Sequence, residues 1–101
     1  MYVLNITTKV NHAIAEEWKN WMLLEHIPEM LSTKLFTSNN FYILLDQEND
    51  EGLTYVSQYF FDDINNYNSY VKDISKAFTE KSILKWSNGF ISFKTIMQSV
   101  Q

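Results

Sequence analysis

The segment around His26 carries the clearest chemical potential in this chain. Residues 25–29 read Glu-His-Ile-Pro-Glu, so one of only two histidines lies between two carboxylates, Glu25 and Glu29. Imidazole titrates near neutral pH, which makes His26 a candidate general acid or base. The alternative is structural, because a histidine at a helix C-terminus interacts favourably with the helix dipole and the free carbonyl groups. The residues alone leave both interpretations open.

Two tryptophans precede this histidine at helical spacing. Trp18 and Trp21 are three residues apart and therefore lie on one face of a helix. We favour core packing against a sheet as their role, and a stacking surface for a flat ligand is the alternative. Trp21 is thus a candidate ligand-binding residue beside His26.

Composition argues against several classes of function. The chain of 101 residues has no cysteine and no arginine, and its net charge is −4. Thiolate chemistry and disulfides are therefore excluded, and no cluster of cations is present for nucleic acid. No apolar run approaches the roughly 20 residues of a membrane helix, and the N-terminus lacks signal-peptide character. We expect a cytoplasmic protein with no nucleic-acid or membrane partner.

No motif for a metal or a phosphate is present, so we expect no metal and no cofactor. The two histidines, His12 and His26, do not have metal-ligand spacing, and no glycine-rich phosphate loop occurs. Residues 46–52 resemble a calcium loop, but Glu51 stands where that loop needs glycine, and Ser57 where it needs a bidentate glutamate. A solvated hairpin tip is the expected role of this segment.

Periodicity predicts the order β-α-β-β-α-β. Residues 2–9, 41–46, 53–62 and 90–97 read as strands, with a polar turn at 47–52. The first helix should stop near His26, because Pro28 disfavours helix at the residue before it. Asp62 or Asp63 caps the second helix, which has the apolar stripe Ile64, Tyr67, Val71, Ile74 and Phe78 and continues or restarts through residue 86. This pattern predicts an α+β, ferredoxin-like single domain over residues 1–101, with both helices on one face of a four-stranded antiparallel sheet.

The other face of that sheet is predicted to be open and only partly wetted. Parity places Leu4 of the first strand toward the helices and Asn5 away from them. The same reasoning puts Ile91, Phe93 and Met97 in the core. It puts Tyr55, Ser57 and Tyr59 on the open face, although the opposite parity of that strand remains possible. The mixture of aromatic and polar groups favours a cavity that a second copy of the chain closes, so we expect a homodimer.

Three segments resemble a family of small uncharacterised bacterial proteins, the domain-of-unknown-function family four-two-eight-six. The first is EEWKNWMLLEHIPEML, with the spacing W-x-x-W-M-x-x-x-H-I-P, and GLTYVSQYFFDD and FISFKTIM are similar to that family's third and fourth strands. The resemblance spans nearly the whole chain. It implies a dimeric α+β barrel of ferredoxin-like subunits and no established activity.

A looser similarity reaches dimeric-barrel families of polyketide and quinone chemistry, where a cavity histidine moves protons. Trp21, His26 and Pro28 match that pattern. Asn5 sits where haem-degrading barrels use an asparagine, but their later histidine and tryptophan have no equivalent here, so haem degradation is not expected.

We therefore predict an uncharacterised dimeric-barrel protein that binds a small apolar or aromatic ligand in a cavity on the open sheet face. Asn5, Trp21, Tyr55 and Tyr59 are the candidate ligand-binding residues. The alternative is a cofactor-free monooxygenase, cyclase or isomerase in which His26 is the general acid or base. A stress or regulatory module acting through protein contacts ranks third, because the acidic turn and tail offer little specificity.

Overall fold

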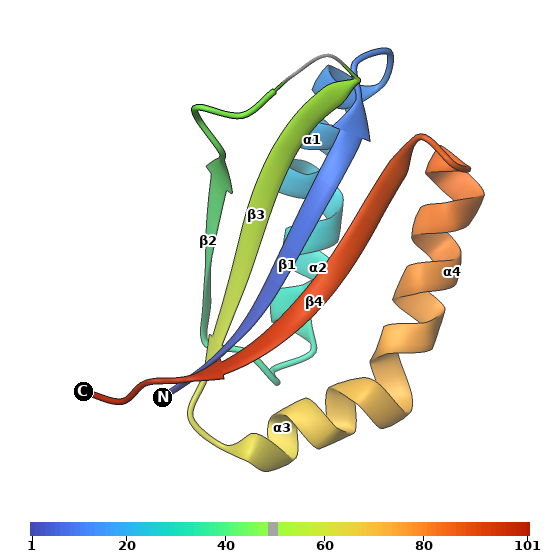
Figure 1. Ribbon diagram of the computed structural model, residues 1–101. Helices are drawn as coiled ribbons and strands as arrows, with labels where there is room; N and C mark the ends of the chain where they lie inside the picture. The colour runs from blue at the N-terminus through green and yellow to red at the C-terminus, as the bar shows by residue number, and fades with distance from the viewer. Residues whose placement is uncertain (49–50) are drawn as a thin grey trace.

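A computed structural model describes residues 1–48 and 51–101 and shows one antiparallel sheet covered by two helical crossovers. The elements are β1 (Tyr2–Asn11), α1 (Ala15–Trp21), η1 (Met22–His26), α2 (Ile27–Ser32), β2 (Ser38–Ile43), β3 (Gly52–Phe61), α3 (Ile64–Ser69), η2 (Tyr70–Ile74), α4 (Ser75–Trp86) and β4 (Phe90–Gln98). The strand order is β2-β3-β1-β4, and Figure 1 shows α1 and α2 behind the centre of the sheet and α4 alongside β4. The predicted ferredoxin-like βαββαβ fold is confirmed. Within the described residues, no helix is both long and apolar enough to cross a membrane.

The strand register shows which side chains face the helices. On β1, Leu4 is fully buried and faces the helices, as predicted. Partners in an antiparallel pair project from the same face, so Tyr59 on β3 and Ile96 on β4, both opposite Leu4, face the helices too. The innermost side chains of the core are Leu4, Val10, Met30, Tyr59 and Phe61.

The predicted faces of β3 and β4 are both wrong. Tyr55 and Tyr59 are buried beneath the helices rather than on the open face. On β4, Ile91 and Phe93 are exposed on the open face, with 70% and 64% of their surface accessible, and Met97 lies there as well. Large apolar residues occur on both faces of these strands. Hydrophobic alternation therefore fails to identify the buried face.

The first crossover does not stop near His26, contrary to the prediction. The Ile27 N–H donates to the Met22 carbonyl oxygen five residues back, which makes η1 a π turn, and the helix then continues as α2. Pro28 lies in the first turn of α2, where its missing N–H is tolerated. The wide turn accommodates Pro28 without ending the helix, so His26 lies inside the helical crossover instead of at its end.

The second crossover contains the same irregularity. Asp63 caps α3 as predicted, and its carboxylate accepts a hydrogen bond from the Asn65 N–H at 2.9 Å. The Ser75 N–H donates to the Tyr70 carbonyl oxygen, so η2 is also a π turn, and its extra residue shifts the phase of the helical pattern. The predicted stripe is therefore partly wrong, because Val71 is exposed and Tyr70 is buried in its place.

The β2–β3 hairpin lies earlier in the chain than predicted. β2 ends at Ile43, three residues before the predicted end, and Leu44 and Leu45 beyond it are exposed. β3 starts at Gly52, where a Cβ atom would collide with the Val10 carbonyl oxygen, so this close approach of β3 and β1 requires glycine. Residues 49–50 of the predicted turn lie outside the described residues.

Candidate functional site

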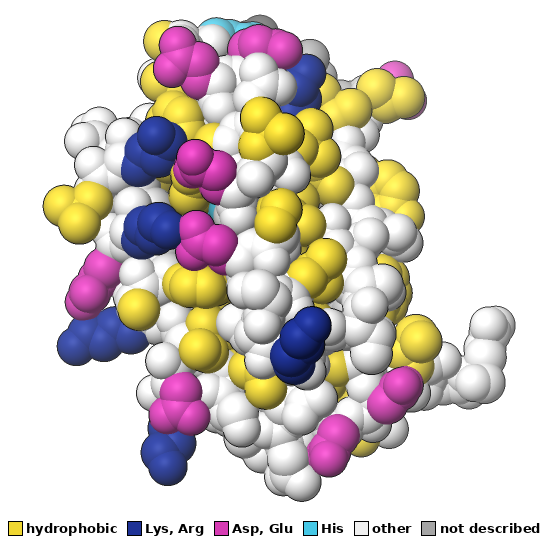
Figure 2. Space-filling model, turned by 180° about the vertical axis from the view of Figure 1, so that it is seen from behind, with side chains coloured by type: hydrophobic (Ala, Val, Ile, Leu, Met, Phe, Trp, Pro, Cys, Tyr) yellow, Lys and Arg dark blue, Asp and Glu magenta, His cyan; other side chains and the backbone are white. Residues whose placement is uncertain are grey.

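A cavity of about 100 Å³ lies between the sheet and the two crossovers. The sheet supplies Ile6, Thr8, Ser57, Tyr59, Phe90, Ser92 and Lys94, and the helical side supplies Trp18, Trp21, Met22, His26, Tyr70, Phe78, Thr79 and Ser82. Figure 2 views this side of the molecule and shows hydrophobic side chains reaching the surface between charged ones. The cavity thus lies on the helix-covered face of the sheet. The predicted cavity on the open face, which a second copy of the chain would close, stays a prediction.

His26 forms part of the cavity wall and is held by aromatic rings. Its imidazole stacks on Trp21, with ring centroids 4.9 Å apart, and meets Phe78 edge-on at 5.5 Å. The pKa of His26 is lowered to about 4, chiefly by burial; the Glu29 carboxylate opposes this shift, and the positive charges of Lys81 and Lys94 add to it. The imidazole is therefore neutral at neutral pH and able to accept a proton or a hydrogen bond. The helix-terminus alternative is wrong, because the helix continues past this residue.

Three polar atoms close to the cavity are buried without a hydrogen-bond partner among the described residues. They are the indole Nε1 of Trp21, the hydroxyl of Tyr59 and the indole Nε1 of Trp86. Trp21 and Tyr59 line the cavity, and Trp86 packs edge-on against Trp21. Burial raises the pKa of Tyr59 far above its usual value, and the nearby Ser57 hydroxyl lowers this pKa. The hydroxyl groups of Tyr59 and Ser57 do not, however, meet the geometry of a hydrogen bond. Orphaned buried donors are rare and unfavourable, and two of the side chains that line the cavity, Trp21 and Tyr59, carry donors that lack an acceptor.

The floor of the cavity is lined with hydroxyl groups. The side chains of Thr8 and Ser92 share a 2.8 Å hydrogen bond across β1 and β4. The Ser57 hydroxyl accepts a 2.9 Å hydrogen bond from the Asn39 amide. Thr8 and Ser57 are both buried, and small hydroxyl side chains at these core positions leave space that larger residues would fill.

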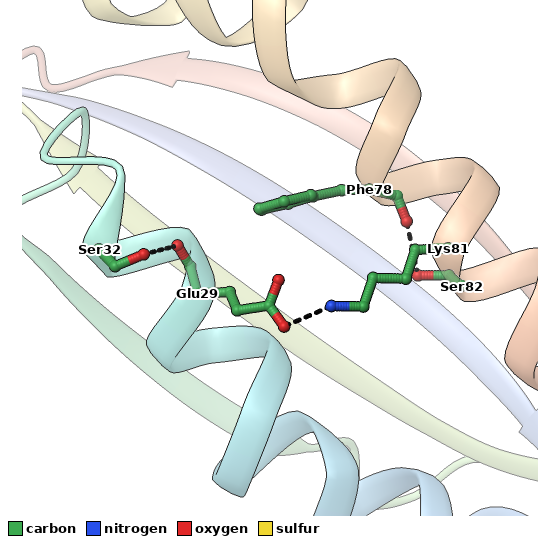
Figure 3. A network of polar contacts seen from close by, with 5 residues as sticks. All are labelled: Glu29, Ser32, Phe78, Lys81 and Ser82. Carbon is green, nitrogen blue, oxygen red and sulfur yellow. Dashed lines mark hydrogen bonds and ion pairs between the residues drawn. The ribbon is translucent and has the colours of Figure 1, made fainter.

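An ion pair links the two crossovers beside the cavity. Figure 3 shows Lys81 of α4 donating to the Glu29 carboxylate of α2 at 2.5 Å, with the Phe78 ring lying between the two helices. About half of the Lys81 side chain and 38% of the Glu29 side chain are accessible to water. The pair therefore bridges the crossovers from the solvent side and contributes little to stability.

Both π turns supply residues to the cavity. Met22 and His26 come from η1, and Tyr70 comes from η2. An α-helix with one inserted residue projects its side chains in new directions, and such turns occur frequently at functional sites. The two irregularities thus converge on one place in the fold.

The family assignment follows from the sequence match. Residues 1–100 match the family model described as "Domain of unknown function (DUF4286)". The chain belongs to the DUF4286 family. No curated protein matches it. The predicted family resemblance is confirmed, and the family description states no activity.

Solved structures with low identity share the fold of this DUF4286 protein. A dimeric ferredoxin-like protein from an uncultured marine organism has a TM-score of 0.74 at 10% identity, over 99% of this chain and 95% of that one. SnoaB, a cofactor-independent oxygenase from Streptomyces nogalater, has a TM-score of 0.68 at 11% identity, over 99% and 94%. An ethyl tert-butyl ether D (EthD) family protein from Bacillus halodurans has a TM-score of 0.67 at 11% identity, over 99% and 100%. At these identities the likeness concerns the fold alone.

The structure brings three of the five predicted site residues together and separates two. Trp21, His26 and Tyr59 meet at the cavity. Tyr55 packs outside the cavity lining, against Trp18 with ring centroids 5.3 Å apart. Asn5 lies on the opposite face, where its side chain bonds those of Thr7 and Gln58. Within residues 1–48 and 51–101, no three metal-binding side chains gather at one place.

Sequence reasoning missed Tyr70, Phe78 and Lys94 as cavity residues. Tyr70 depends on the phase shift in η2, which no residue type predicts, whereas Phe78 belonged to the predicted apolar stripe but was not chosen as a site residue. Lys94 lies on the helix side of β4, together with Ser92. Polar residues at matched positions of adjacent strands, such as Thr8 and Ser92, were the available signal for a polar floor beneath the helices.

Proposed function

We propose that this DUF4286 protein is a homodimer in which each subunit binds a small, mostly apolar or aromatic molecule in the cavity on the helix side of its sheet. The observation that carries this proposal is the pair of buried, unpartnered donors on Trp21 and Tyr59 in the cavity wall. A ligand oxygen that accepts from either donor would remove a desolvation penalty of about 1–3 kcal/mol. The surrounding Ile6, Met22, Phe78 and Phe90 side chains favour an apolar ligand body.

The size of the cavity limits the ligand. A volume of about 100 Å³ holds a few waters or part of a single ring, whereas a ring-sized ligand needs about 150 Å³. The adjustable wall is α4, because none of its residues is buried. A small outward movement of Phe78 and Ser82 on this helix would complete the space for one aromatic ring.

The homodimer part of the proposal rests on the open face of the sheet. Ile91, Phe93, Tyr42 and Met97 leave 70%, 64%, 49% and 39% of their surfaces exposed on this face. A second copy would cover these side chains through an isologous contact, which requires about 1,000 Å² in total. Two similar solved structures are described as dimeric. We expect Phe93→Lys to yield a monomer in sedimentation velocity, whereas a native chain that sediments as a monomer at micromolar concentration would remove this part of the proposal.

Ligand binding is testable through the three indole N–H groups of the protein. In a ¹H–¹⁵N spectrum, phenol should shift the indole resonance of Trp21 most, because this side chain lines the cavity and its N–H has no hydrogen-bond partner. Tyr59→Phe should weaken phenol binding about fivefold to tenfold, the size of one neutral hydrogen bond. Tyr42→Phe on the exposed face is the matched control and should leave binding unchanged. Absence of any saturable shift with phenol and with toluene would refute the cavity as a ligand site.

A second function, cofactor-free proton-transfer catalysis, is supported by His26. Its neutral imidazole lies in the cavity wall and would take a proton from an activated C–H or O–H of the ligand, becoming imidazolium. The Tyr59 hydroxyl would then donate a hydrogen bond to the resulting enolate oxygen. This is the first half of an isomerisation or cyclisation, and the imidazolium returns the proton to another atom.

Deuterium exchange at an enolisable ketone tests this second function. The protein in D₂O should speed exchange at the benzylic carbon of phenylacetone, as followed by NMR, and His26→Gln should remove that acceleration. His12→Gln is a control that also removes one imidazole. If the exchange rate is the same with the native protein, with His26→Gln and in buffer alone, His26 is excluded as a general base. The proposal of ligand binding would not be affected by that result.

A further inference from the structure

Lys94 gives the cavity one charged group. Its ammonium Nζ donates to the Tyr70 hydroxyl at 2.8 Å and to the Ser75 hydroxyl at 2.9 Å, and lies 5.0 Å from the centroid of the Tyr70 ring. The side chain thus reaches from β4 across to η2 and the start of α4, at the rim of the cavity. Two hydroxyl acceptors and an aromatic ring hold the ammonium group in place but do not neutralise it.

The charge of Lys94 is not balanced by a nearby carboxylate. Over residues 1–48 and 51–101, the ion pairs are Lys19 with Glu16 and Lys81 with Glu29, and neither includes Lys94. The described residues that line the cavity include no Asp or Glu. The titratable groups that interact with Lys94 are Tyr70 of η2, whose hydroxyl accepts its hydrogen bond, and His26 of η1, whose pKa the Lys94 charge lowers. Because His26 is neutral at neutral pH, Lys94 leaves the cavity with a net positive charge.

The shape and the charge of the cavity together indicate the chemical class of its ligand. The interior is aromatic and aliphatic, whereas the rim has one cation fixed by hydrogen bonds. An apolar ring with an anionic oxygen would satisfy both parts, because the oxygen would accept a charge-assisted hydrogen bond from Nζ. A neutral ring would fill only the interior and would leave the ammonium group with its two hydroxyl partners.

We propose that the ligand is a small aromatic molecule with an ionisable oxygen, of the phenol or enol class, and that Lys94 binds it selectively as the anion. This inference rests on the proposed ligand cavity and adds the charge state of the ligand. Lys94 is then the specificity-determining residue, and Tyr70 is a positioning residue that orients the ammonium group.

The test compares two probes that differ in charge. Para-nitrophenol reports its own ionisation by visible absorbance, and nitrobenzene is an uncharged analogue of nearly the same shape. The native protein should lower the apparent pKa of bound para-nitrophenol by about one unit, which corresponds to roughly tenfold tighter binding of the phenolate than of the phenol. Nitrobenzene should bind with an affinity close to that of the neutral phenol.

Two variants assign the effect to Lys94. Lys94→Met should abolish the pKa change of the probe, because the charge is lost while the aliphatic stem is kept. Tyr70→Phe should give an intermediate change, since the ring remains and only the hydroxyl acceptor is lost. Lys76→Met is the matched control, with the same loss of net charge at an exposed position of α4 outside the cavity lining. Circular dichroism confirms that each variant is folded.

The outcomes separate this inference from the proposed function. If the native protein binds nitrobenzene and para-nitrophenolate equally, the cavity binds ligands but the inference is wrong. A pKa change that persists in Lys94→Met, or that disappears in Lys76→Met, also overturns it. If neither probe binds, the ligand cavity itself is refuted. The measurement on the native protein decides the question even if Lys94→Met fails to fold.

Discussion

The two crossovers that cover the sheet contain one π turn each, but they pack against it very differently. The first crossover buries six residues, Ala15, Trp18, Trp21, Met22, Ile27 and Met30. In the second crossover, Tyr70 is the buried residue, and α4 buries none. Figure 1 shows the reason, since α1 and α2 lie behind the centre of the sheet whereas α4 lies alongside the edge strand β4. Burial of apolar surface holds the first crossover, and the second depends on fewer and weaker contacts.

This difference assigns distinct roles to the two sides of the cavity. The first crossover presents His26 and Trp21 from a well-packed wall, which keeps their geometry fixed. The second crossover supplies Phe78 from α4, a helix with no buried residue. In the proposed function, the first crossover would form the rigid wall of the ligand cavity and the second the adjustable wall, because regions of low local stability supply such adjustable parts.

The largest expected effect is a loss of stability in the first crossover. Met30 is fully buried in α2, so Met30→Ala should lower the free energy of unfolding by about 3 kcal/mol. Leu84 is 86% exposed in α4, and Leu84→Ala should change stability by less than about 0.5 kcal/mol. Urea denaturation followed by circular dichroism measures both. Equal losses would show that the two crossovers do not differ in packing as described.

The next effect is the pH dependence that His26 introduces. Its pKa is about 4 in the folded chain and 6.5 for the unperturbed group, so between these values the unfolded state binds more protons. Stability should therefore be complete above about pH 6.5 and fall by roughly 3 kcal/mol as the pH drops to about 4, with little further loss from this group below that. Denaturation of the native chain and His26→Gln across this range isolates the contribution. A variant with an unchanged pH profile would contradict the buried neutral imidazole.

A smaller effect of opposite sign is expected at Tyr59. The hydroxyl is buried without a partner, so Tyr59→Phe should raise the free energy of unfolding by about 1 kcal/mol even as it weakens phenol binding. Tyr42→Phe on the exposed face should change neither quantity. Thermal denaturation and phenol titration of the same samples give the two numbers. A loss of stability in Tyr59→Phe would mean that the hydroxyl has a partner in the folded protein.

The smallest energetic effect is expected at the ion pair between the crossovers. Lys81→Met removes the bond to Glu29 and should lower stability by less than about 1 kcal/mol, because the pair is partly exposed and screened. Amide hydrogen exchange should nevertheless quicken selectively in α4, since this pair is a direct link from α4 to α2. Lys85→Met, which removes a cation lying over Trp86, is the control on the same helix. Uniform acceleration in α1, α2 and α4 would indicate that the second crossover is no looser than the first.

Much of this fold was predictable because local patterns and topology rules agree. Period-two alternation identifies β1, and Asp63 caps α3 as expected. The order of the elements indicates the ferredoxin-like arrangement. The site was predictable only in part. His26 and Trp21 stand out by residue type and spacing, and Tyr59 was chosen on the wrong face and still lines the cavity. Lys94 was missed because the predicted parity of the last strand, with Ile91, Phe93 and Met97 in the core, put Lys94 on the open face.

The sequence by itself determined the family, the βαββαβ order and the presence of a histidine and tryptophans in the first crossover, since these depend on local periodicity, residue types and spacing. Only the tertiary structure decided where those side chains point. Two π turns rotate the helical faces, and strands with apolar residues on both sides take their buried face from register rather than from composition. Such choices depend on contacts between residues far apart in the chain, as where Tyr70 of η2 meets Lys94 of β4.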